Sequence, residues 1–430
     1  MNSSKTSHTN SLNQPLSTIF TLDLRSLVLL RIGLAAMTIS DLLIRLPQIE
    51  TYYSDAGILP RQELINNLPA AFWSFHLFNG SVFAQQMLFC LAVFFAGWLL
   101  IGYRTTLASI ICWVMLISLH NRNPTLVSPG DDMLRIAMFW SLFLPLGAEY
   151  SSDRALNTSS KYIPSTVCSG ATLSFILLLG GVYLRQLLNI AEANPVSWLS
   201  CFGWGLILIP WRNSWWRGVA IVLLLVLHLS QGVTTASIVM AFLWLALIPS
   251  QFWQLLDHKS SSSAARELII NYDRDCGFCK KVVYLLRTAL ILPQTKLLVA
   301  QDNPDIYIDM ERYNSWVVEG EGGDRYFKWH GIAYVVSLSP ILWWLAPILR
   351  IKPLMLLGNK VYETIANNRS LMGNLTKPLN FRSLKVHSSI LSNIFTLLLM
   401  ALILWSNFFH INYQDAALQF TRLDLPQNIF

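Results

Sequence analysis

The chain has 430 residues, of which 53% are hydrophobic and only 13% are charged, and its formal net charge is +7. Charged residues make up about a quarter of a typical soluble domain, so the composition argues against a wholly soluble protein. The positive charge does not indicate nucleic acid, because the Lys and Arg residues stand mainly in short loops beside apolar runs, as they do in membrane proteins. We therefore predict an integral membrane protein with lipid, and no nucleic acid, as a partner.

The first part of the chain consists of apolar runs joined by short polar loops. Residues 1–18 are polar and lack the features of a cleaved signal peptide, so we expect a disordered lead. Later runs approach the ~20 apolar residues that cross a bilayer. The candidate spans are 20–44, 82–101, 106–120, 133–147, 171–191, 196–211, 218–249 and 389–411. The run 218–249 is interrupted by SQGVTTAS and is expected to form two helices or one broken helix, so the fold class is a mainly α polytopic membrane protein with about eight to nine transmembrane helices.

The composition changes after the Ser-rich segment 256–266, which is typical of a linker. Beyond it, charges, Gly pairs and short alternating stretches predict a small α/β domain of βαβββα type at 267–370. Its expected elements, in chain order, are a strand at 267–273, a helix at 276–290, a strand at 295–300, a hairpin of 315–320 and 324–329, and a helix pair over 331–349.

Cys276 and Cys279 stand in CxxC spacing where the helix after the first of these strands is expected to begin. Unpaired backbone N–H groups and the positive end of the helix dipole at that position stabilise a thiolate, which is the reactive form. The three-residue offset brings the second thiol within disulfide reach, so Cys279 can resolve a mixed disulfide formed at Cys276. Asp273 and Asp275 are expected to shape the turn or to assist proton transfer. The expected cofactor is the redox-active Cys276–Cys279 disulfide itself.

Two other interpretations of the cysteine pair stay open. A structural zinc site needs two further ligands, and the domain offers only His330 as another soft ligand, so we predict no metal site. Alternatively, the pair is chemically inert. Four further cysteines lie in or beside apolar spans without paired spacing, where such side chains pack as small hydrophobic groups. They are Cys90, Cys112, Cys168 and Cys201.

Ionisable residues within apolar runs are costly to bury and are therefore candidates for a functional role. Arg185 and His228 are expected to face a shared cavity, where Arg185 binds an anionic or quinone-like headgroup and His228 relays a proton. Buried structural roles for both stay equally open. Asp131 and Asp132 are expected to cap the span that follows them. The candidate cofactor-binding residues of the membrane cavity are Arg185, His228, His120, Arg122, Asp132 and Arg135.

The distribution of Lys and Arg predicts the orientation of the chain. Short loops on the side of the N-terminus hold more of these residues than the opposite loops, which predicts a cytoplasmic N-terminus. If the run 218–249 crosses twice, the cysteine domain lies in the cytoplasm as well. The expected location is a bacterial-type inner membrane.

The stretch YDRDCGFCKKVV resembles the DCC-type thiol–disulfide oxidoreductase family, and the resemblance extends over about 267–370 through SWVV, HGIAYVVSLS and the closing VYETIANNR. This resemblance implies a thioredoxin-like fold and an exchange of thiols and disulfides. Two departures from the expected pattern are visible. No Pro immediately precedes the SWVV strand, where a cis-Pro would face the CxxC of a thioredoxin, and Arg274 stands at a turn position that is usually Gly.

Residues 15–255 are similar to the HTTM (horizontally transferred transmembrane) domain of vitamin K-dependent γ-carboxylase-like proteins. The stretches that carry the similarity are LRIGLAAMTISDLLIRLPQIETYYSDAGILP, SLHNRNPTLVSPGDDMLRIAMFWSLFLPLG, GGVYLRQL and LHLSQG. A carboxylase of that family uses a Lys base within the stretch that matches 180–187, where this chain has Arg185. Because an Arg side chain stays protonated in proteins, the resemblance supports the membrane fold and argues against carboxylation of glutamate.

Taken together, the sequence predicts a membrane-anchored thiol–disulfide oxidoreductase whose electron partner is a protein thiol or disulfide, or a lipid-soluble quinone. A carboxylase-like membrane enzyme and a non-catalytic membrane scaffold are the alternatives. The predicted organisation is a disordered lead, an HTTM-like membrane domain, a linker, a DCC-type thioredoxin-like domain and a C-terminal transmembrane helix. Their bounds are 1–18, 19–255, 256–266, 267–370 and 388–411.

Overall fold

The structure is a computed structural model of the chain. It describes residues 19–67, 73–159, 163–188, 195–209, 215–260, 262–384 and 390–408, apart from the side chains of residues 182–188, 197, 258–260 and 403–408. The predicted disordered lead at 1–18 lies outside the described residues, and so does the side chain of Arg185.

The chain divides into two compact units. The first comprises Met1–Leu146, Pro164–Gln251 and Val386–Phe430, and the second comprises Gly147–Ile163 and Phe252–Lys385. Residues 147–163 therefore pack with the cysteine-bearing part of the chain, a contribution that the predicted domain bounds do not include. The short helix α8 (Ser152–Ala155) of this segment contacts α15 (Gly277–Ala289), and Asp153 forms an ion pair with Arg382.

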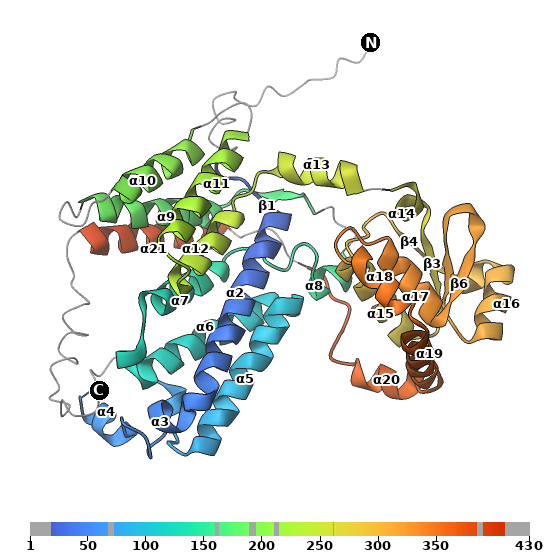
Figure 1. Cartoon of the computed structure of the whole chain (residues 1–430), viewed down its shortest axis with the longest axis horizontal. Helices are drawn as coiled ribbons and strands as arrows, with labels where there is room; N and C mark the ends of the chain where they lie inside the picture. Colours follow the sequence, from blue (N-terminus) through green and yellow to red (C-terminus); the bar gives the residue numbers. More distant parts are fainter. Residues whose placement is uncertain are drawn as a thin grey trace, which may run out of the picture. The chain divides into compact units, whose positions relative to one another are not determined.

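The described part of the first unit consists almost entirely of helices (Figure 1). Its larger helices are α2 (Leu24–Arg45), α5 (Val82–Ile101), α6 (Thr105–Arg122), α7 (Pro129–Ser141), α9 (Gly170–Leu188), α10 (Pro195–Ile207), α11 (Trp215–Ser230), α12 (Thr235–Leu245) and α21 (Ile390–Phe408). The smaller elements are β1 (Leu22–Asp23), α3 (Ile49–Tyr53), α4 (Arg61–Asn67), β2 (Thr166–Val167) and the start of α13 (Ser250–Ser260). Each predicted span thus overlaps a helix, although α7 ends at Ser141 within the predicted span 133–147, and the run 218–249 forms the pair α11 and α12.

Local sequence signals explain where these helices begin and end. Ser81 precedes α5 and its Oγ accepts a hydrogen bond from the N–H of Ala84 at 3.3 Å, which satisfies a free backbone donor. Gly102 ends α5 in the left-handed conformation with φ 70°, which a residue without a Cβ adopts at little cost. Between α11 and α12, Gly232 takes φ 112° and separates the two helices.

The predicted number of eight to nine membrane spans is not reached within the described residues. Two helical stretches, Leu24–Tyr53 with 30 residues and Val82–Ile101 with 20 residues, are long and apolar enough to cross a membrane. The pair Thr235–Leu245 and Ser250–Asp257, which is bent by 75°, counts as a third if it forms one span. Several other apolar runs form helices of only 11–16 residues, because turns such as the one at Gly232 divide them. A perpendicular helix of that length is shorter than the ~20 residues that a bilayer requires.

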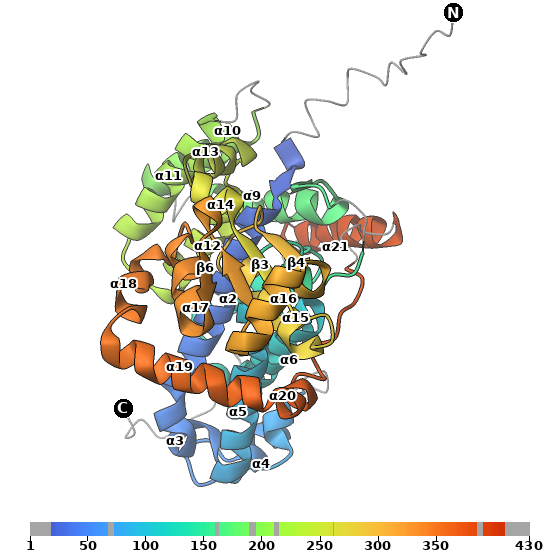
Figure 2. The same ribbon diagram turned by 90° about the vertical axis from the view of Figure 1, so that its right-hand side faces the viewer.

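The second unit contains a four-stranded mixed sheet. Its strands are β3 (Ile269–Tyr272), β4 (Lys296–Val299), β5 (Val317–Glu319) and β6 (Arg325–Phe327), in the spatial order β4-β3-β5-β6. Strand β3 pairs in parallel with β4 and antiparallel with β5, and β5 pairs antiparallel with β6. The remaining helices are α14 (Ser263–Glu267), α15 (Gly277–Ala289), α16 (Pro304–Tyr313), α17 (Lys328–Ser337), α18 (Ala346–Leu349), α19 (Lys352–Asn367) and α20 (Arg369–Leu375). In Figure 2, α19 leads directly into α20.

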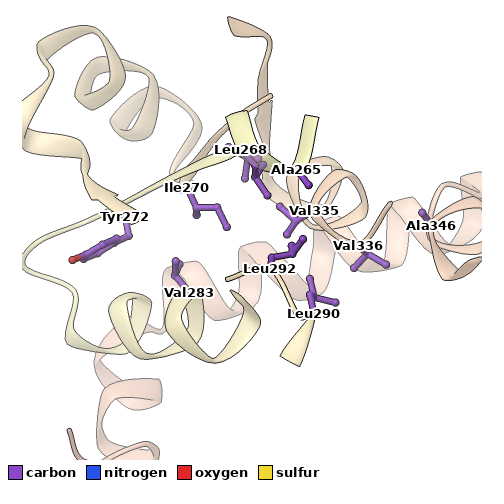
Figure 3. Packing of buried hydrophobic residues seen from close by; sticks show 11 residues of the cluster. Ala265, Leu268, Ile270, Tyr272, Val283, Leu290, Leu292, Val335, Val336 and Ala346 are labelled. Atoms are coloured by element: carbon purple, nitrogen blue, oxygen red, sulfur yellow. The ribbon is translucent and has the colours of Figure 1, made fainter. Parts of the chain in front are cut away.

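Alternation along β5 builds a core on each face of the sheet. Val318 packs with Ile270 of β3, Val283 of α15 and Val335 of α17 on one face, and Figure 3 shows Ile270 and Val283 between their strand and helix. Val317 packs on the other face with a smaller cluster that includes Ile306 and Met310 of α16. Because successive side chains of a strand point to opposite faces, α15 and α17 cover one face and α16 covers the other.

The predicted elements of this unit agree with the structure, but two helices within the predicted bounds, α16 and α19, were omitted. The EGGD hairpin closes through the N–H of Gly320, which donates to the carbonyl of Asp324 at 2.8 Å. Helix α16 was not expected. Its signal is the pair Asn303–Pro304, because Asn303 caps the helix by accepting a hydrogen bond from the N–H of Asp305 at 3.1 Å, and Pro304 opens its first turn.

Candidate functional site

The cysteine pair lies at the junction between β3 and α15. Strand β3 ends at Tyr272, and α15 begins at Gly277 with Cys276 as its N-cap residue. Cys276 and Cys279 form a disulfide, and their Cα atoms are 5.2 Å apart. The Sγ of Cys276 also accepts a hydrogen bond from the N–H of Cys279 at 3.1 Å. This N–H is one of the donors that a helix start leaves unpaired, so it stabilises negative charge on the Cys276 sulfur after reduction.

The two cysteines differ in their exposure. Cys276 is buried, with 9% of its surface exposed, whereas Cys279 is half-buried. The ammonium groups of the next two residues, Lys280 and Lys281, have partners in the segment that follows α19. Lys281 Nζ donates to the carbonyl of Thr376 at 2.8 Å, near the end of α20, and Lys280 Nζ lies 5.2 Å from the ring centroid of Phe381.

The turn before Cys276 is organised by Asp273. Its Oδ1 accepts a hydrogen bond from the N–H of Asp275 at 3.0 Å, which closes the turn locally. The same oxygen accepts a second hydrogen bond from Gln301 Nε2 at 2.7 Å. Gln301 Oε1 in turn accepts from the N–H of Arg274 at 3.1 Å, and the Arg274 side chain forms an ion pair with Asp302. The segment after β4 therefore braces the turn that holds the cysteines.

Arg369 joins this turn to the last part of the domain. Its Nη1 lies 3.5 Å from Asp273 Oδ2, and its Nη2 donates to Asn314 Oδ1 at 2.7 Å. Asn314 ends α16 in the left-handed conformation with φ 47°, and its Nδ2 donates to Asn367 Oδ1 at 3.1 Å. Arg369 closes the stretch VYETIANNR, so the contacts give a physical reason for its place in the motif.

A second set of contacts fixes the segment that precedes β5. Tyr362 Oη accepts a hydrogen bond from the N–H of Trp316 at 3.2 Å and lies 3.2 Å from Ser315 Oγ. Ser315 is fully buried, and its Oγ accepts from the N–H of Lys328 at 2.7 Å. Burial raises the pKa of Tyr362, so its hydroxyl stays protonated at neutral pH. Asn314 immediately precedes SWVV, where the expected Pro is lacking, and no peptide bond of the described residues is cis.

His330, the residue considered as a further zinc ligand, lies away from this network. It lines a hollow together with Tyr326, Trp329, Tyr334 and Arg350. Among the described residues, the group of His, Cys, Asp and Glu side chains that lie close enough to share an ion does not include His330 or either cysteine of the disulfide.

The residues predicted for a membrane cavity do not form one group among the described side chains. Arg122 donates to the carbonyls of Leu59 at 2.9 Å and Ser54 at 3.0 Å. Asp132 and Arg135 form an ion pair at 2.6 Å, with 49% and 33% of their side chains exposed. His228 lies half-buried in α11.

His120 has different neighbours. Its Nε2 lies 4.0 Å from Asp131 Oδ1. Asp131 caps α7 together with Ser128, in the capping role that the sequence suggests for it. The same carboxylate forms an ion pair with Arg45 of α2 at 2.8 Å. Asp131 and Asp41, which also contacts Arg45, are ionisable residues in or beside apolar runs and so were functional candidates, but they were not among the residues predicted to line the membrane cavity.

Sequence reasoning missed Gln301, Asn314 and Arg369 in the network around the cysteine turn, and it missed Tyr362 as the partner of the segment before β5. The recurrence of the stretch VYETIANNR with the CxxC was the available signal for Tyr362 and Arg369. Gln301 and Asn314 carry no local signal, because polar residues near strand and helix ends are common. Only the sheet order and the position of α16 bring them to the turn.

The fold and the disulfide together define a class of protein: a dithiol–disulfide site at the start of a helix, on a mixed four-stranded sheet with helices on both faces. Comparison with known families agrees, since residues 270–374 match the family model of DCC1-like thiol-disulfide oxidoreductase. The chain therefore carries a DCC1-like thiol-disulfide oxidoreductase domain. No curated protein and no solved structure matches the chain.

Proposed function

We propose that the protein is a membrane-anchored thiol–disulfide oxidoreductase that uses Cys276 and Cys279. The observation that carries the proposal is the disulfide at the start of α15, where the N–H of Cys279 points at the Cys276 sulfur. The family match over residues 270–374 supports the same chemistry. The connectivity β3-α15-β4-α16-β5-β6-α17, with order β4-β3-β5-β6, supports the thioredoxin-like fold that the resemblance implies.

In the proposed exchange, the reduced enzyme attacks a substrate disulfide with the Cys276 thiolate. A new Cys276–substrate bond forms, the substrate S–S bond breaks, and one substrate sulfur leaves as a thiolate that takes up a proton. The Cys279 thiolate then attacks Cys276 Sγ, which releases the second substrate thiol and forms the Cys276–Cys279 disulfide. Two electrons pass to the substrate, and a dithiol supplies the next pair to the enzyme. In the opposite direction, the enzyme disulfide oxidises a substrate dithiol, and the reduced enzyme then passes two electrons and two protons to a quinone, which becomes the quinol. Asp273 holds the turn through the N–H of Asp275, and assistance to proton transfer by Asp273 or Asp275 is part of the proposal.

Apolar side chains on the helices of the first unit support membrane anchoring. Phe83 and Phe94 of α5 are 69% and 55% exposed, and Val222 and Val226 of α11 are 60% and 59% exposed. Such exposed apolar faces are unusual on soluble monomers and mark surfaces that contact lipid or another protein. They also give a lipid-soluble quinone access to the protein, which is why we include a quinone among the electron partners. The predicted cytoplasmic side of the domain and the HTTM-like character of residues 15–255 are parts of this proposal.

The test is alkylation trapping of the purified full chain across a glutathione redox series from about −150 to about −320 mV, which spans common cellular poises. We expect Cys276 and Cys279 to titrate together as one two-electron couple. In Cys279→Ser, Cys276 should form a stable mixed disulfide with glutathione, and Cys276→Ser should not. Cys112→Ser, which removes a buried free thiol, is the matched control and should leave the couple unchanged.

A pair that never oxidises over this range would leave only the scaffold alternative. A mixed disulfide that persists in Cys276→Ser would assign the attacking role to Cys279. Reoxidation by a quinone that is lost in both Cys276→Ser and Arg185→Ala would connect the first unit to the electron transfer. Unchanged reoxidation in Arg185→Ala would remove that residue from the proposed quinone site.

A further inference from the structure

Three ionisable side chains of the first unit come together although they are far apart in the sequence. Asp41 lies in α2, His120 in the last turn of α6, and Asp131 in the first turn of α7. One ligand atom from each, a carboxylate oxygen or an imidazole nitrogen, lies within 4.8 Å of the other two. The cluster joins three helices and is separate from the disulfide site.

Buried atoms without hydrogen-bond partners face this cluster. The side chain of His120 is 1% exposed and that of Asp131 is 3% exposed. Within the described part of the chain, both ring nitrogens of His120 and the Oδ2 of Asp41 are buried and make no hydrogen bond. Polar atoms in protein interiors are nearly always paired, and leaving them unpaired is costly. An ion bound between these residues would satisfy Asp41 Oδ2 and one of the two ring nitrogens of His120.

Arg45 holds the two carboxylates but leaves room on them for another partner. Its Nε donates to Asp41 Oδ1 and its Nη2 donates to Asp131 Oδ1, both at 2.8 Å. Its Nη1 donates to Tyr53 Oη at 2.9 Å. A carboxylate has about four lone-pair positions, so each group can accept from Arg45 and also bind a cation. Two carboxylates and one guanidinium leave one net negative charge, which favours a positive ligand.

The orientation of Asp131 is fixed from its other side. The N–H of Ser128 donates to Asp131 Oδ2 at 2.7 Å, which directs Oδ1 toward His120 and Arg45. His120 lies at the carboxyl end of α6, where unpaired carbonyl groups carry partial negative charge. Hydrogen bonds that orient a ligating side chain are a regular feature of metal sites.

We propose that Asp41, His120 and Asp131 bind one divalent transition-metal ion. An imidazole with two carboxylates suits Zn²⁺ or Mn²⁺, whereas Mg²⁺ and Ca²⁺ take oxygen ligands alone. An ion about 2.0–2.2 Å from each atom spans the 4.0 Å between His120 Nε2 and Asp131 Oδ1 only at an angle wider than tetrahedral, so we expect the three side chains to move closer together when the ion binds. Three protein ligands leave one position for water or a further ligand. The ion ties α2, α6 and α7 together and neutralises the excess negative charge.

The experiment uses the purified full chain in detergent with Cys276→Ser, Cys279→Ser, Cys90→Ser and Cys168→Ser, so that neither the CxxC nor the two exposed free thiols compete for the metal. After treatment with a chelator, the protein is titrated with Zn²⁺ against a chromophoric competitor, and with Mn²⁺ by electron paramagnetic resonance. We expect one ion per chain, with coupling of Mn²⁺ to an imidazole nitrogen. His120→Gln and Asp41→Asn should each weaken binding by more than about 100-fold, because losing even a side chain that only orients a ligand costs roughly 10- to 100-fold.

Asp132→Asn is the matched control, because it removes the same charge from the residue next to Asp131 and should leave affinity unchanged. Unchanged affinity in folded His120→Gln would overturn the proposal, and so would the absence of a stoichiometric ion in the parent protein. If His120→Gln does not fold, the imidazole coupling in the parent protein decides instead. Mn²⁺ bound without nitrogen coupling would also overturn the assignment of His120.

Discussion

The two units place their charged side chains in opposite ways. Around the disulfide of the second unit, Asp273, Gln301 and Arg369 lie at a half-exposed edge, and the structure supplies each of them with a hydrogen-bond partner. In the first unit, His120 and Asp41 are held between helices with polar atoms that lack a partner. The hydrogen-bonded network of the second unit orients the disulfide, which is part of the protein itself. The unpaired polar atoms of the first unit support the proposal that a metal ion binds there.

The difference also appears in how each unit obtains its stability. The second unit has a sheet with apolar clusters on both faces. The first unit exposes apolar side chains along its helices and buries polar ones among them. Substitutions of core residues should therefore lower the free energy of unfolding most in the second unit. A change of pH should lower it most in the first unit.

The largest expected effect is on the core of the second unit. Ile270 is fully buried on a central strand, so Ile270→Ala should lower the free energy of unfolding of this unit by about 2–5 kcal/mol. Ile308→Ala, on the exposed face of α16 where Ile308 is 62% exposed, is the control and should change it by less than about 0.5 kcal/mol. Urea-dependent protease resistance of residues 252–385 in the full chain measures both. Equal losses would contradict the assignment of this core.

Acid should destabilise the first unit through His76. This side chain is buried against Gln85, with Nδ1 2.6 Å from Gln85 Oε1, and burial lowers the pKa of His76 to about 4. Between that value and the ordinary pKa of about 6.5 the unfolded chain binds the proton and the folded chain does not. Stability is therefore complete above pH about 6.5 and falls by about 3 kcal/mol as the pH drops to about 4.

Thermal unfolding of the full chain across this pH range measures the effect. In His76→Gln the acid-dependent loss between pH about 6.5 and about 4 should shrink, because the group that takes up the proton on unfolding is gone. His330→Gln, which changes an exposed histidine of the second unit, should retain the full loss. If His76→Gln lost as much stability as the parent protein between pH about 6.5 and about 4, the assignment of the effect to His76 would be wrong.

Two glycines of the second unit should respond to alanine with opposite signs. A Cβ on Gly358 of α19 would lie 2.1 Å from Trp329 Cδ2, so Gly358→Ala should destabilise the unit by about 1–3 kcal/mol. A Cβ on Gly373 of α20 would meet no atom within 4 Å, so Gly373→Ala should stabilise it by about 0.5–1 kcal/mol. Urea unfolding of the two variants compares them directly, and a stabilised Gly358→Ala would refute the close packing of α17 on α19.

The smallest expected effect concerns the polar edge of the disulfide site. Asp273 and Arg369 are 3.5 Å apart with side chains 19% and 29% exposed, so their coupling should be about 0.5–1 kcal/mol. A double-mutant cycle of Asp273→Asn and Arg369→Gln in Cys279→Ser measures it through the rate of Cys276 alkylation. Arg369→Gln alone should slow alkylation, since the remaining carboxylate then disfavours the thiolate. Additive effects would show that the pair does not act on Cys276.

Much of the second unit could be predicted from the sequence because its signals are local. Alternating apolar residues marked β3, β4, β5 and β6, and the position of CxxC after a strand predicted a helix start at Cys276. Helix α16 was missed because its stretch has few apolar residues and only Asn303–Pro304 marks its beginning. The described residues contain fewer membrane spans than were predicted, because hydropathy measures how apolar a run is, but not where its helix stops.

By itself the sequence determined which segments form helices and strands, where the two reactive thiols lie, and that much of the surface is apolar. Those properties depend on neighbouring residues, through backbone geometry and the period of apolar side chains. The tertiary structure decided which distant polar groups meet: Arg369 with Asp273 at the disulfide, and Asp41 with His120 and Asp131 between three helices. No local sequence pattern predicts these contacts, because they depend on how whole helices and strands pack.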